Sequence, residues 1–386
     1  MKRNIENTDN CFGCFLCEAV CPRKCIQKTK KSDGFYFPTV IDDSCVECGK
    51  CLSACPVNQE WGNKPLEIVG VRHNSFSVLK NSTSGGAFTA ITDWIIGNNG
   101  VVFGASFDDK YQVVHTCASD YEGRDRMRGA KYVKSDTGGI YNQVEEALKK
   151  GKYVLFSGTP CQIAAVKSFC ALKKLPQEQL ITVDLICHGA PSPVIFADYL
   201  KILQKKYGNL VSYTFRDKEI GWHGQNVTAK FESGKKVNKG FVKYFSALYF
   251  RSYITMECCH SCKYSSLFRV GDITLGDFWG VEKYYSKYSD NQGVSLVMIN
   301  SERGKFLFNN VKEHLSYWQT TDQECMQQNL IAPSTSNKYK KIFYKVYRLA
   351  GFRIAYYLTI ILQFMDDVSS KVRQIMKNNH RSKTEK

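Results

Sequence analysis

Residues 11–22 read CFGCFLCEAVCP, and residues 45–56 read CVECGKCLSACP. Both stretches follow the spacing C-x2-C-x2-C-x3-C-P, so the second repeats the first as an internal duplication. Three cysteines at this interval wrap one corner of a cubane iron–sulfur cluster, whereas the fourth points away and ligates the other cluster. The following proline lacks an N–H and suits a sharp reversal of the chain. The duplication therefore predicts two [4Fe-4S] clusters.

Each expected ligand set takes its fourth cysteine from the other repeat. One cluster takes Cys11, Cys14, Cys17 and Cys55, and the other takes Cys45, Cys48, Cys51 and Cys21. Zinc is the alternative, but a zinc site takes two cysteine pairs and needs neither a third cysteine at this interval nor a repeated Cys-Pro. Residues 11–56 resemble a bacterial two-cluster ferredoxin module, which implies electron transfer between closely spaced clusters. Cys25 has no place in this arrangement, and we expect a small packed thiol there.

The composition is that of a globular, intracellular protein. The chain has 386 residues, 43% of them hydrophobic, with 17 cysteines and a net charge of +17. This balance excludes a fully disordered chain. The first ten residues are polar and predict no secretory signal, so we expect a cytoplasmic protein, with the inner face of the membrane as a further location. Clustered thiols in a reducing compartment bind metal or do redox chemistry more often than they form disulfides.

Beyond residue 66 the pattern predicts alternating strands and helices. Expected strands cover 68–71, 100–107, 152–156 and 180–186, and expected helices cover 87–96, 162–172 and 193–206. This alternation favours βαβ units and a parallel sheet within a mixed α/β, or α+β, core. The predicted domains are a ferredoxin-type module at 1–62, two parts of one core at 66–150 and 151–335, and a basic helical tail at 336–386.

A third metal site is expected in the core. Cys161 and Cys187 each follow a predicted parallel strand, at the sheet edge where α/β proteins bind ligands. Cys259 and Cys262 form a C-x2-C pair farther along the chain. The four thiols predict a third [4Fe-4S] cluster. In the alternative, Cys161 and Cys187 are inert, and the pair binds zinc with Cys258 or His260.

Several strings of the core resemble the family of beta subunits of coenzyme F420-reducing hydrogenases and dehydrogenases. They are SGGAF at 84–88, RGAKYV at 128–133, FSGTPCQIA at 156–164, CHGAPSP at 187–193, CHSCKY at 259–264 and RVGDITLGDFWG at 269–280. The resemblance implies a flavin-binding core that carries its own cluster, receives electrons from the fused ferredoxin, and uses FAD. Coenzyme F420 or another small organic substrate is the implied acceptor.

The flavin contacts are less defined, because the chain has no G-x-G-x-x-G fingerprint. Ser84, Gly85 and Gly86 form a loop before a predicted helix, and the backbone N–H groups of this loop are suited to a phosphate or a flavin carbonyl. Lys131 lies in a basic stretch and offsets the charge of a pyrophosphate or a reduced flavin. For each of these residues the alternative is a structural or solvated role. Asp272 and Asp277 are expected to cap turns or to order the cluster loop.

The last fifty residues carry 12 Lys and Arg against 3 Asp and Glu. Residues 349–364 are mostly apolar but too few to span a bilayer, which needs about 20. A basic amphipathic helix suits an anionic membrane surface, and packing against the core or a partner is the alternative.

Two functions follow. One is an oxidoreductase that passes electrons through the clusters and FAD to an organic acceptor. The other is a non-catalytic electron-transfer subunit that docks on a redox partner protein. No nucleic-acid motif accompanies the basic charge, so nucleic-acid binding is not expected. We assign no role to Cys117, Cys170, Cys258 or Cys325.

Overall fold

The computed structural model of the chain describes residue 5 and residues 10–224 and 226–384; the other residues of the predicted N-terminal module and basic tail lie outside the description. Across these ranges the core is an eight-stranded mixed sheet in the order β13-β3-β12-β11-β7-β6-β4-β5. The central strands β11 (Ile273–Asp277), β7 (Leu180–Leu185), β6 (Val154–Gly158) and β4 (Val101–Phe107) run parallel to one another. The flanking strands β5 (Val113–Ala118), β12 (Ser295–Ile299), β3 (Glu67–His73) and β13 (Leu315–Gln319) pair antiparallel. The predicted mixed α/β core is confirmed, and its sheet takes strands from both sides of residue 150.

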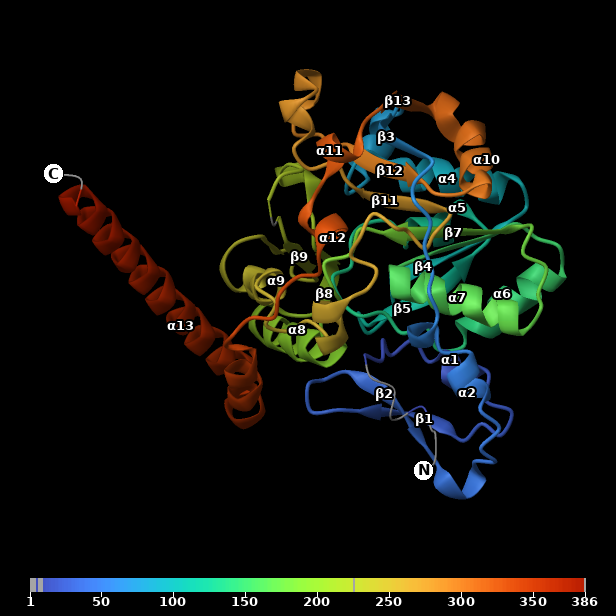
Figure 1. Cartoon of the computed structure of the whole chain (residues 1–386), viewed down its shortest axis with the longest axis horizontal. Coiled ribbons are helices and arrows are strands. Elements are labelled where there is room, and N and C mark those ends of the chain that lie inside the picture. The colour runs from blue at the N-terminus through green and yellow to red at the C-terminus, as the bar shows by residue number, and fades with distance from the viewer. Residues whose placement is uncertain (1–4, 6–9, 225, 385–386) are drawn as a thin grey trace.

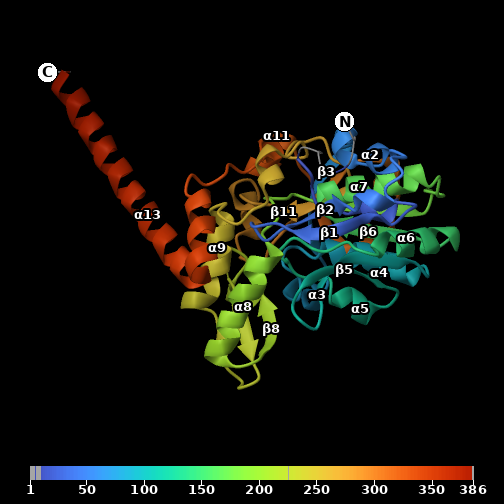
Figure 2. The same cartoon turned by 90° about the horizontal axis from the view of Figure 1, so that it is seen from below.

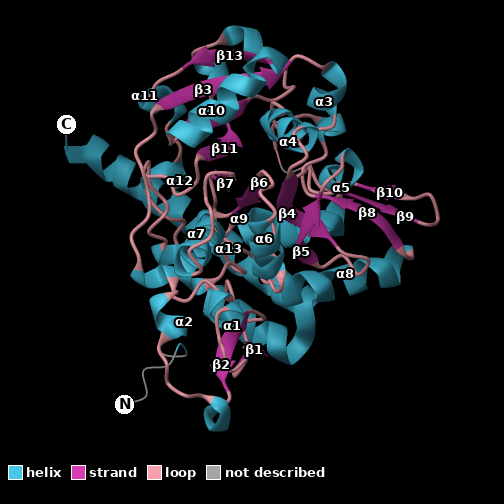
Figure 3. Ribbon diagram, turned by 90° about the vertical axis from the view of Figure 1, so that its right-hand side faces the viewer, coloured by secondary structure: helices cyan, strands magenta, loops and turns pink. Residues whose placement is uncertain are grey.

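Helices cover both faces of the sheet (Figure 3). Successive side chains of a strand point to opposite faces, so Phe103 and Phe156 pack on one face and Val102 and Leu155 on the other. The first face is covered by α6 (Ile140–Lys149) and α7 (Pro160–Leu172). The second is covered by α4 (Ala87–Gly97) and α10 (Glu302–Val311), with α3 (Phe76–Lys80) and α5 (Tyr121–Asp125) nearby.

The ferredoxin-like region lies beside the α6 and α7 face (Figure 1). It contains α1 (Leu16–Ala19), the antiparallel strands β1 (Ile26–Lys30) and β2 (Tyr36–Val40), and α2 (Lys50–Ser53). Its side chains Phe12, Leu16 and Phe35 are buried in the same hydrophobic cluster as α6 and α7. Tyr141 of α6 donates a 2.8 Å hydrogen bond to the carbonyl of Cys14. The region is therefore packed against the core rather than tethered to it by a linker alone.

A second hydrophobic cluster lies beside the sheet, around α8 (Pro193–Tyr207) and α9 (Tyr244–Phe250). The antiparallel strands β8 (Leu210–Thr214), β9 (Thr228–Phe231) and β10 (Lys236–Val237) complete this layer. The short helices α11 (Asp322–Cys325) and α12 (Gln328–Ile331) follow the sheet in the chain.

The C-terminal helix α13 (Lys340–Thr384) is interrupted at Gly351, whose φ is 78°. Before and just after this break, Phe343, Phe352 and Tyr356 are buried in the cluster around α8 and α9. Farther on, the helix projects away from the body of the molecule (Figure 2). No helix in the described ranges has a stretch that is long and apolar enough to cross a bilayer.

Candidate iron–sulfur centres and the adjoining cavity

The first thiol group consists of Cys11, Cys14, Cys17 and Cys55. Burial raises the pKa of Cys14 to about 12, and the Cys11 and Cys55 thiolates act in the same direction. Burial also raises the pKa of Cys17, again with contributions from the other three thiolates of the group. Cys55, from the second repeat, thus lies beside three thiols of the first repeat. This is the crossed arrangement that the duplicated spacing predicts.

The second thiol group is more open to solvent. Cys21, Cys45, Cys48 and Cys51 line a cavity of about 40 Å³. Cys48 is exposed, and the other three are partly exposed. Cys25 lines the same cavity, with its Sγ 3.4 Å from the Sγ of Cys21. It is buried, as a packed thiol should be. Its position four residues after Cys21 is the only sign in the sequence that it belongs to this group.

The core thiol group brings together Cys161, Cys187, Cys259 and Cys262. Burial raises the pKa of Cys187, and the Cys259, Cys161 and Cys262 thiolates add to this effect. Cys161 lies in the first turn of α7, shortly after β6, and Cys187 lies two residues after the end of β7. Because β6 and β7 are adjacent and parallel, both thiols reach the same edge of the sheet.

Gly189 allows the segment that carries Cys259 and Cys262 to lie close to Cys161 and Cys187. Its φ is +111°, and a Cβ at this position would lie 2.4 Å from Thr255 Cγ2 and 3.2 Å from Cys259 Cβ. A larger residue would therefore separate the loop after β7 from the segment that carries Cys259 and Cys262.

The surroundings of these thiols bear on the choice of metal. Both ring nitrogens of His260 have partners in the chain: Nδ1 lies 2.8 Å from the Ser334 carbonyl and Nε2 lies 3.1 Å from Lys340 Nζ. A [4Fe-4S] cluster is held by four cysteine thiolates, so the donor set of these four thiols fits such a cluster.

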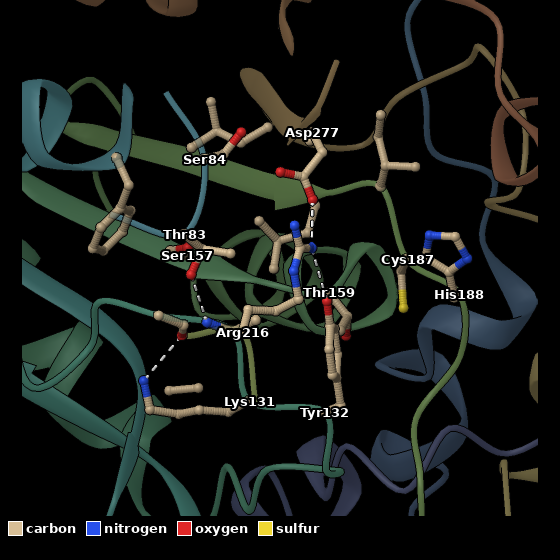
Figure 4. A pocket seen from close by; sticks show the side chains of 18 of the residues that line it. Thr83, Ser84, Lys131, Tyr132, Ser157, Thr159, Cys187, His188, Arg216 and Asp277 are labelled. Atoms are coloured by element: carbon tan, nitrogen blue, oxygen red, sulfur yellow. Dashed lines mark hydrogen bonds and ion pairs between the residues drawn. The ribbon is translucent and has the colours of Figure 1, made fainter. Parts of the chain in front are cut away.

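A cavity of about 530 Å³ adjoins the core thiol group. It lies at the carboxyl ends of β6, β7 and β11, with Ser157, Cys187 and Asp277 among its lining residues (Figure 4). This is the edge at which open α/β sheets bind ligands. The volume is in the range of cofactor and small-molecule sites. Because Cys187 belongs both to the thiol group and to the lining, a molecule in the cavity would lie next to the core thiol group.

The residues expected to contact a flavin lie around this cavity with one difference. Ser84, Gly86 and Lys131 line it, but Gly85 does not. The Gly85 N–H donates to Ser295 Oγ at 2.9 Å, and Ser84 Oγ donates to the Val294 carbonyl at 2.7 Å. These two groups fix the loop on β12 and are already satisfied.

The Lys131 ammonium donates to three carbonyls of the segment after α5, those of Met127, Arg128 and Gly129. Burial lowers the pKa of Lys131 to about 7. The Lys131 ammonium at the cavity wall therefore loses its proton more readily than an exposed lysine does.

A charged pair that the sequence does not predict lies on the side of the cavity opposite Lys131. Arg216 donates to Asp277 at 2.9 Å (Figure 4). The Arg216 guanidinium lies 5.0 Å from the centre of the Trp279 ring. Trp222 Nε1 also donates to Asp277, at 2.7 Å. The sequence suggests only a turn or the cluster loop for Asp277, because Arg216 lies in a distant, irregular segment that no local pattern connects to it.

Comparison with known proteins gives matches to both parts of the chain. Residues 151–323 match the family model for the C terminus of the coenzyme F420 hydrogenase/dehydrogenase beta subunit, and residues 10–59 match the 4Fe-4S dicluster domain. Residues 151–323 therefore carry the C-terminal domain that this family model describes, and residues 10–59 carry a 4Fe-4S dicluster domain. Both resemblances found in the sequence are thereby confirmed, and the dicluster domain supports iron–sulfur clusters in the N-terminal part.

Individual relatives are distant. The F subunit of F(420)H(2) dehydrogenase from Methanosarcina mazei is 22% identical over 80% of this chain and 84% of its own length. The I 2 subunit of NADH-quinone oxidoreductase from Geobacter metallireducens is 31% identical over 18% of this chain and 57% of its own length. A chain of the F420-reducing [NiFe] hydrogenase complex from Methanosarcina barkeri aligns with 76% of this chain and 96% of its own length, at 17% identity and a TM-score of 0.46.

Proposed function

We propose that the chain is an iron–sulfur flavoprotein oxidoreductase that passes electrons from two ferredoxin-type clusters, through a core [4Fe-4S] cluster and FAD, to a small organic acceptor. The observation that carries the proposal is that Cys187 is shared by the core thiol group and the large cavity. A redox cofactor in that cavity would lie beside the core cluster. Coenzyme F420, named in the matched family, is one acceptor of this class.

The three thiol groups supply the residues that would hold the clusters. Cys11, Cys14, Cys17 and Cys55 would hold the first cluster, Cys21, Cys45, Cys48 and Cys51 the second, and Cys161, Cys187, Cys259 and Cys262 the third. Ser84, Gly86 and Lys131 would contact the flavin at one side of the cavity. Bound FAD would supply the conversion between the single electrons of the clusters and the electron pair of an organic substrate.

The exposure of the thiols indicates which cluster site an external redox protein can reach. The second group includes the exposed Cys48, whereas Cys14, Cys17 and Cys55 of the first group are buried. An external redox protein would therefore meet the second group, and the cavity offers the organic molecule a separate place. The direction of net electron flow between these two ends depends on the partners.

The second candidate function is a non-catalytic subunit that carries electrons to a partner enzyme. The observation that favours it is that the Methanosarcina mazei relative is named as a subunit of a dehydrogenase. The two functions differ in whether the chain alone reacts with a small acceptor.

We also propose that α13 contacts an anionic membrane surface. Around and beyond the buried Tyr356, the helix exposes the apolar residues Ile354, Ile361, Phe364 and Val368, at 56%, 56%, 68% and 44% of their surface. Their spacing places them along one side of the helix. The basic excess of residues 337–386 matches the negative charge of such a surface.

An anaerobic redox assay of the full chain separates the two functions. The protein is reduced with dithionite, excess reductant is removed, and candidate acceptors including coenzyme F420 are added one at a time. Reoxidation of the protein by at least one small acceptor, together with retained flavin, supports the oxidoreductase. A flavin-free protein that is reoxidised only by redox proteins would favour the carrier subunit.

A further inference from the structure

Two buried donors near the thiols have no hydrogen-bond partner in the part of the chain that the structure describes: Lys134 Nζ and Tyr264 Oη. Tyr264 is only 3% exposed. A buried donor without a partner destabilises the folded state, and a charged donor does so more strongly. Such groups are rare in folded proteins and call for a partner that the polypeptide does not supply.

Both donors lie where the first thiol group faces the core thiol group. The Lys134 ammonium interacts electrostatically with Cys14 of the first group and with Cys161 and Cys259 of the core group. The Tyr264 hydroxyl interacts with thiols of the same two groups, namely Cys161, Cys262, Cys14 and Cys55.

The packing agrees with this placement. The Tyr264 ring lies 5.7 Å from the ring of Phe12, which follows Cys11. The backbone N–H of Lys134 donates to the Pro191 carbonyl at 2.9 Å, next to the loop that carries Cys187. Gly13 also comes close to the core segment, since a Cβ at this position would lie 3.3 Å from Met256 Cε. The first and core thiol groups are thus neighbours, with the two donors between them.

We propose that Lys134 and Tyr264 are positioning residues that donate to the sulfur atoms of the first and core clusters and so raise the reduction potentials of both. The inference rests on the proposed function, because it needs a cluster on each side. One-electron reduction adds one negative charge to a cluster. A cation and a hydrogen-bond donor in a buried site stabilise that added charge, since water does not screen it there.

Lys134 contributes the charge and Tyr264 the directed hydrogen bond. Loss of either group should make electron uptake by the two adjacent clusters less favourable. The second ferredoxin-type cluster should not respond, because the thiols that interact with the two donors belong to the first and core groups.

The test is an anaerobic redox titration of the full chain, followed by electron paramagnetic resonance, for the wild type, Lys134→Met and Tyr264→Phe. Tyr264→Phe removes only the hydroxyl and keeps the ring in place. We expect two of the three cluster midpoints to become more negative in each variant, with the third midpoint unchanged. Lys134→Arg should restore the wild-type values.

Lys167→Met is the matched control. Lys167 is a partly buried lysine whose Nζ donates to the Val270 carbonyl at 2.5 Å, and its electrostatic partners are carboxylates and Arg303 rather than thiols. Its cluster midpoints should equal those of the wild type.

Three results would overturn the inference. Unchanged midpoints in Lys134→Met and Tyr264→Phe proteins that retain all three clusters would contradict it and leave the proposed function intact. A change confined to the flavin midpoint would mean that Lys134, which also lines the cavity, acts on the flavin and not on the clusters. A wild-type protein with only two clusters would contradict the inference and the core cluster together.

Discussion

Cys161 and Cys170 belong to the same helix, α7, but have different surroundings. Cys161 interacts with Cys187 and Cys262, and its Sγ lies 3.2 Å from Thr159 Oγ1. Cys170 is fully buried in the hydrophobic cluster under the sheet, and burial raises its pKa to about 12. Only the first of these thiols is placed to bind a shared metal centre.

Replacement of Cys161 should therefore remove the core cluster selectively. We expect Cys161→Ser to lose about four irons per chain, because a cubane holds four. Cys170→Ala should keep the wild-type iron content even if it lowers stability. Iron and sulfide analysis of the two variants, purified under nitrogen, decides this. Equal iron content in Cys161→Ser and the wild type would refute the assignment.

Cys25 places a fifth thiol beside the four cysteines of the second thiol group. Its Sγ lies 3.4 Å from that of Cys21, and the two thiols line the same cavity. We expect Cys21→Ser to keep most of its iron, with an altered resonance spectrum, because Cys25 takes over as the fourth ligand. The double variant Cys21→Ser/Cys25→Ser should lose about four irons. If the single and double variants lose the same amount of iron, Cys25 is not a substitute ligand.

A bulky residue in the cavity should reduce flavin binding without changing the iron content. Ser157 is 8% exposed and lines the cavity from β6. Ser157→Leu adds apolar volume at a position that faces the cavity, so we expect the flavin-to-protein ratio to fall while iron stays at the wild-type level. Flavin fluorescence after acid release measures the first quantity. Full flavin content in this variant would place the flavin elsewhere.

At the scale of elements, a buried ion pair fixes the segment that carries Cys259 and Cys262. Arg269 is 1% exposed and Asp184 of β7 is fully buried, and Arg269 donates to Asp184 at 2.9 Å. Arg269 also donates to the Tyr264 carbonyl at 3.0 Å, and Asp184 accepts from the Val270 and Gly271 N–H groups. These contacts join the loop after Cys262 to the strand that precedes Cys187.

Breaking this pair should destabilise the whole core. Removal of one partner leaves a buried charge unpaired, so we expect Arg269→Met to lower the free energy of unfolding by about 3–5 kcal/mol. Urea denaturation of the cluster-free protein measures the change. Lys201→Met is the control, because the Lys201–Asp198 pair is on the surface and should contribute about 1 kcal/mol or less. A similar loss in both variants would contradict the special role of the Arg269 pair.

The exposed side of α13 should bind anionic vesicles. We expect the full chain to sediment with vesicles that contain phosphatidylglycerol and to remain in solution with pure phosphatidylcholine. The double variant Ile361→Glu/Phe364→Glu should lose this binding, because it removes apolar surface and adds negative charge. Phe268→Glu alters an apolar residue that is 59% exposed elsewhere on the surface, and it should bind as the wild type does. Undiminished binding of the double variant would contradict a membrane contact through this face.

At the scale of the whole molecule, the parts that the sequence predicted are those that depend on local or repeated patterns. The spacing around Cys11 and Cys45 predicted the two N-terminal thiol groups with their exchanged members. The strands and helices around Cys161 and Cys187 predicted that both thiols reach one sheet edge. In each case the decisive geometry lies within a short segment or follows from the parallel pairing of neighbouring strands.

The contacts that the sequence did not predict join distant segments. Arg216 and Asp277 form an ion pair at one side of the cavity, and Lys134 and Tyr264 both lie between two thiol groups, although no local pattern links these residues. The Gly85 N–H was expected at a ligand but is taken by Ser295 of β12. Such partners are set by tertiary packing, which periodicity and spacing do not encode.

We propose that three thiol groups and one cavity form a single redox chain from the ferredoxin-like region to a flavin. Combined analysis of iron, sulfide and flavin in the full chain, reconstituted without oxygen, tests for this set of cofactors. We expect about 12 irons, at four per cluster, and one FAD per chain. A protein that holds about 8 irons and no flavin after such reconstitution would contradict it.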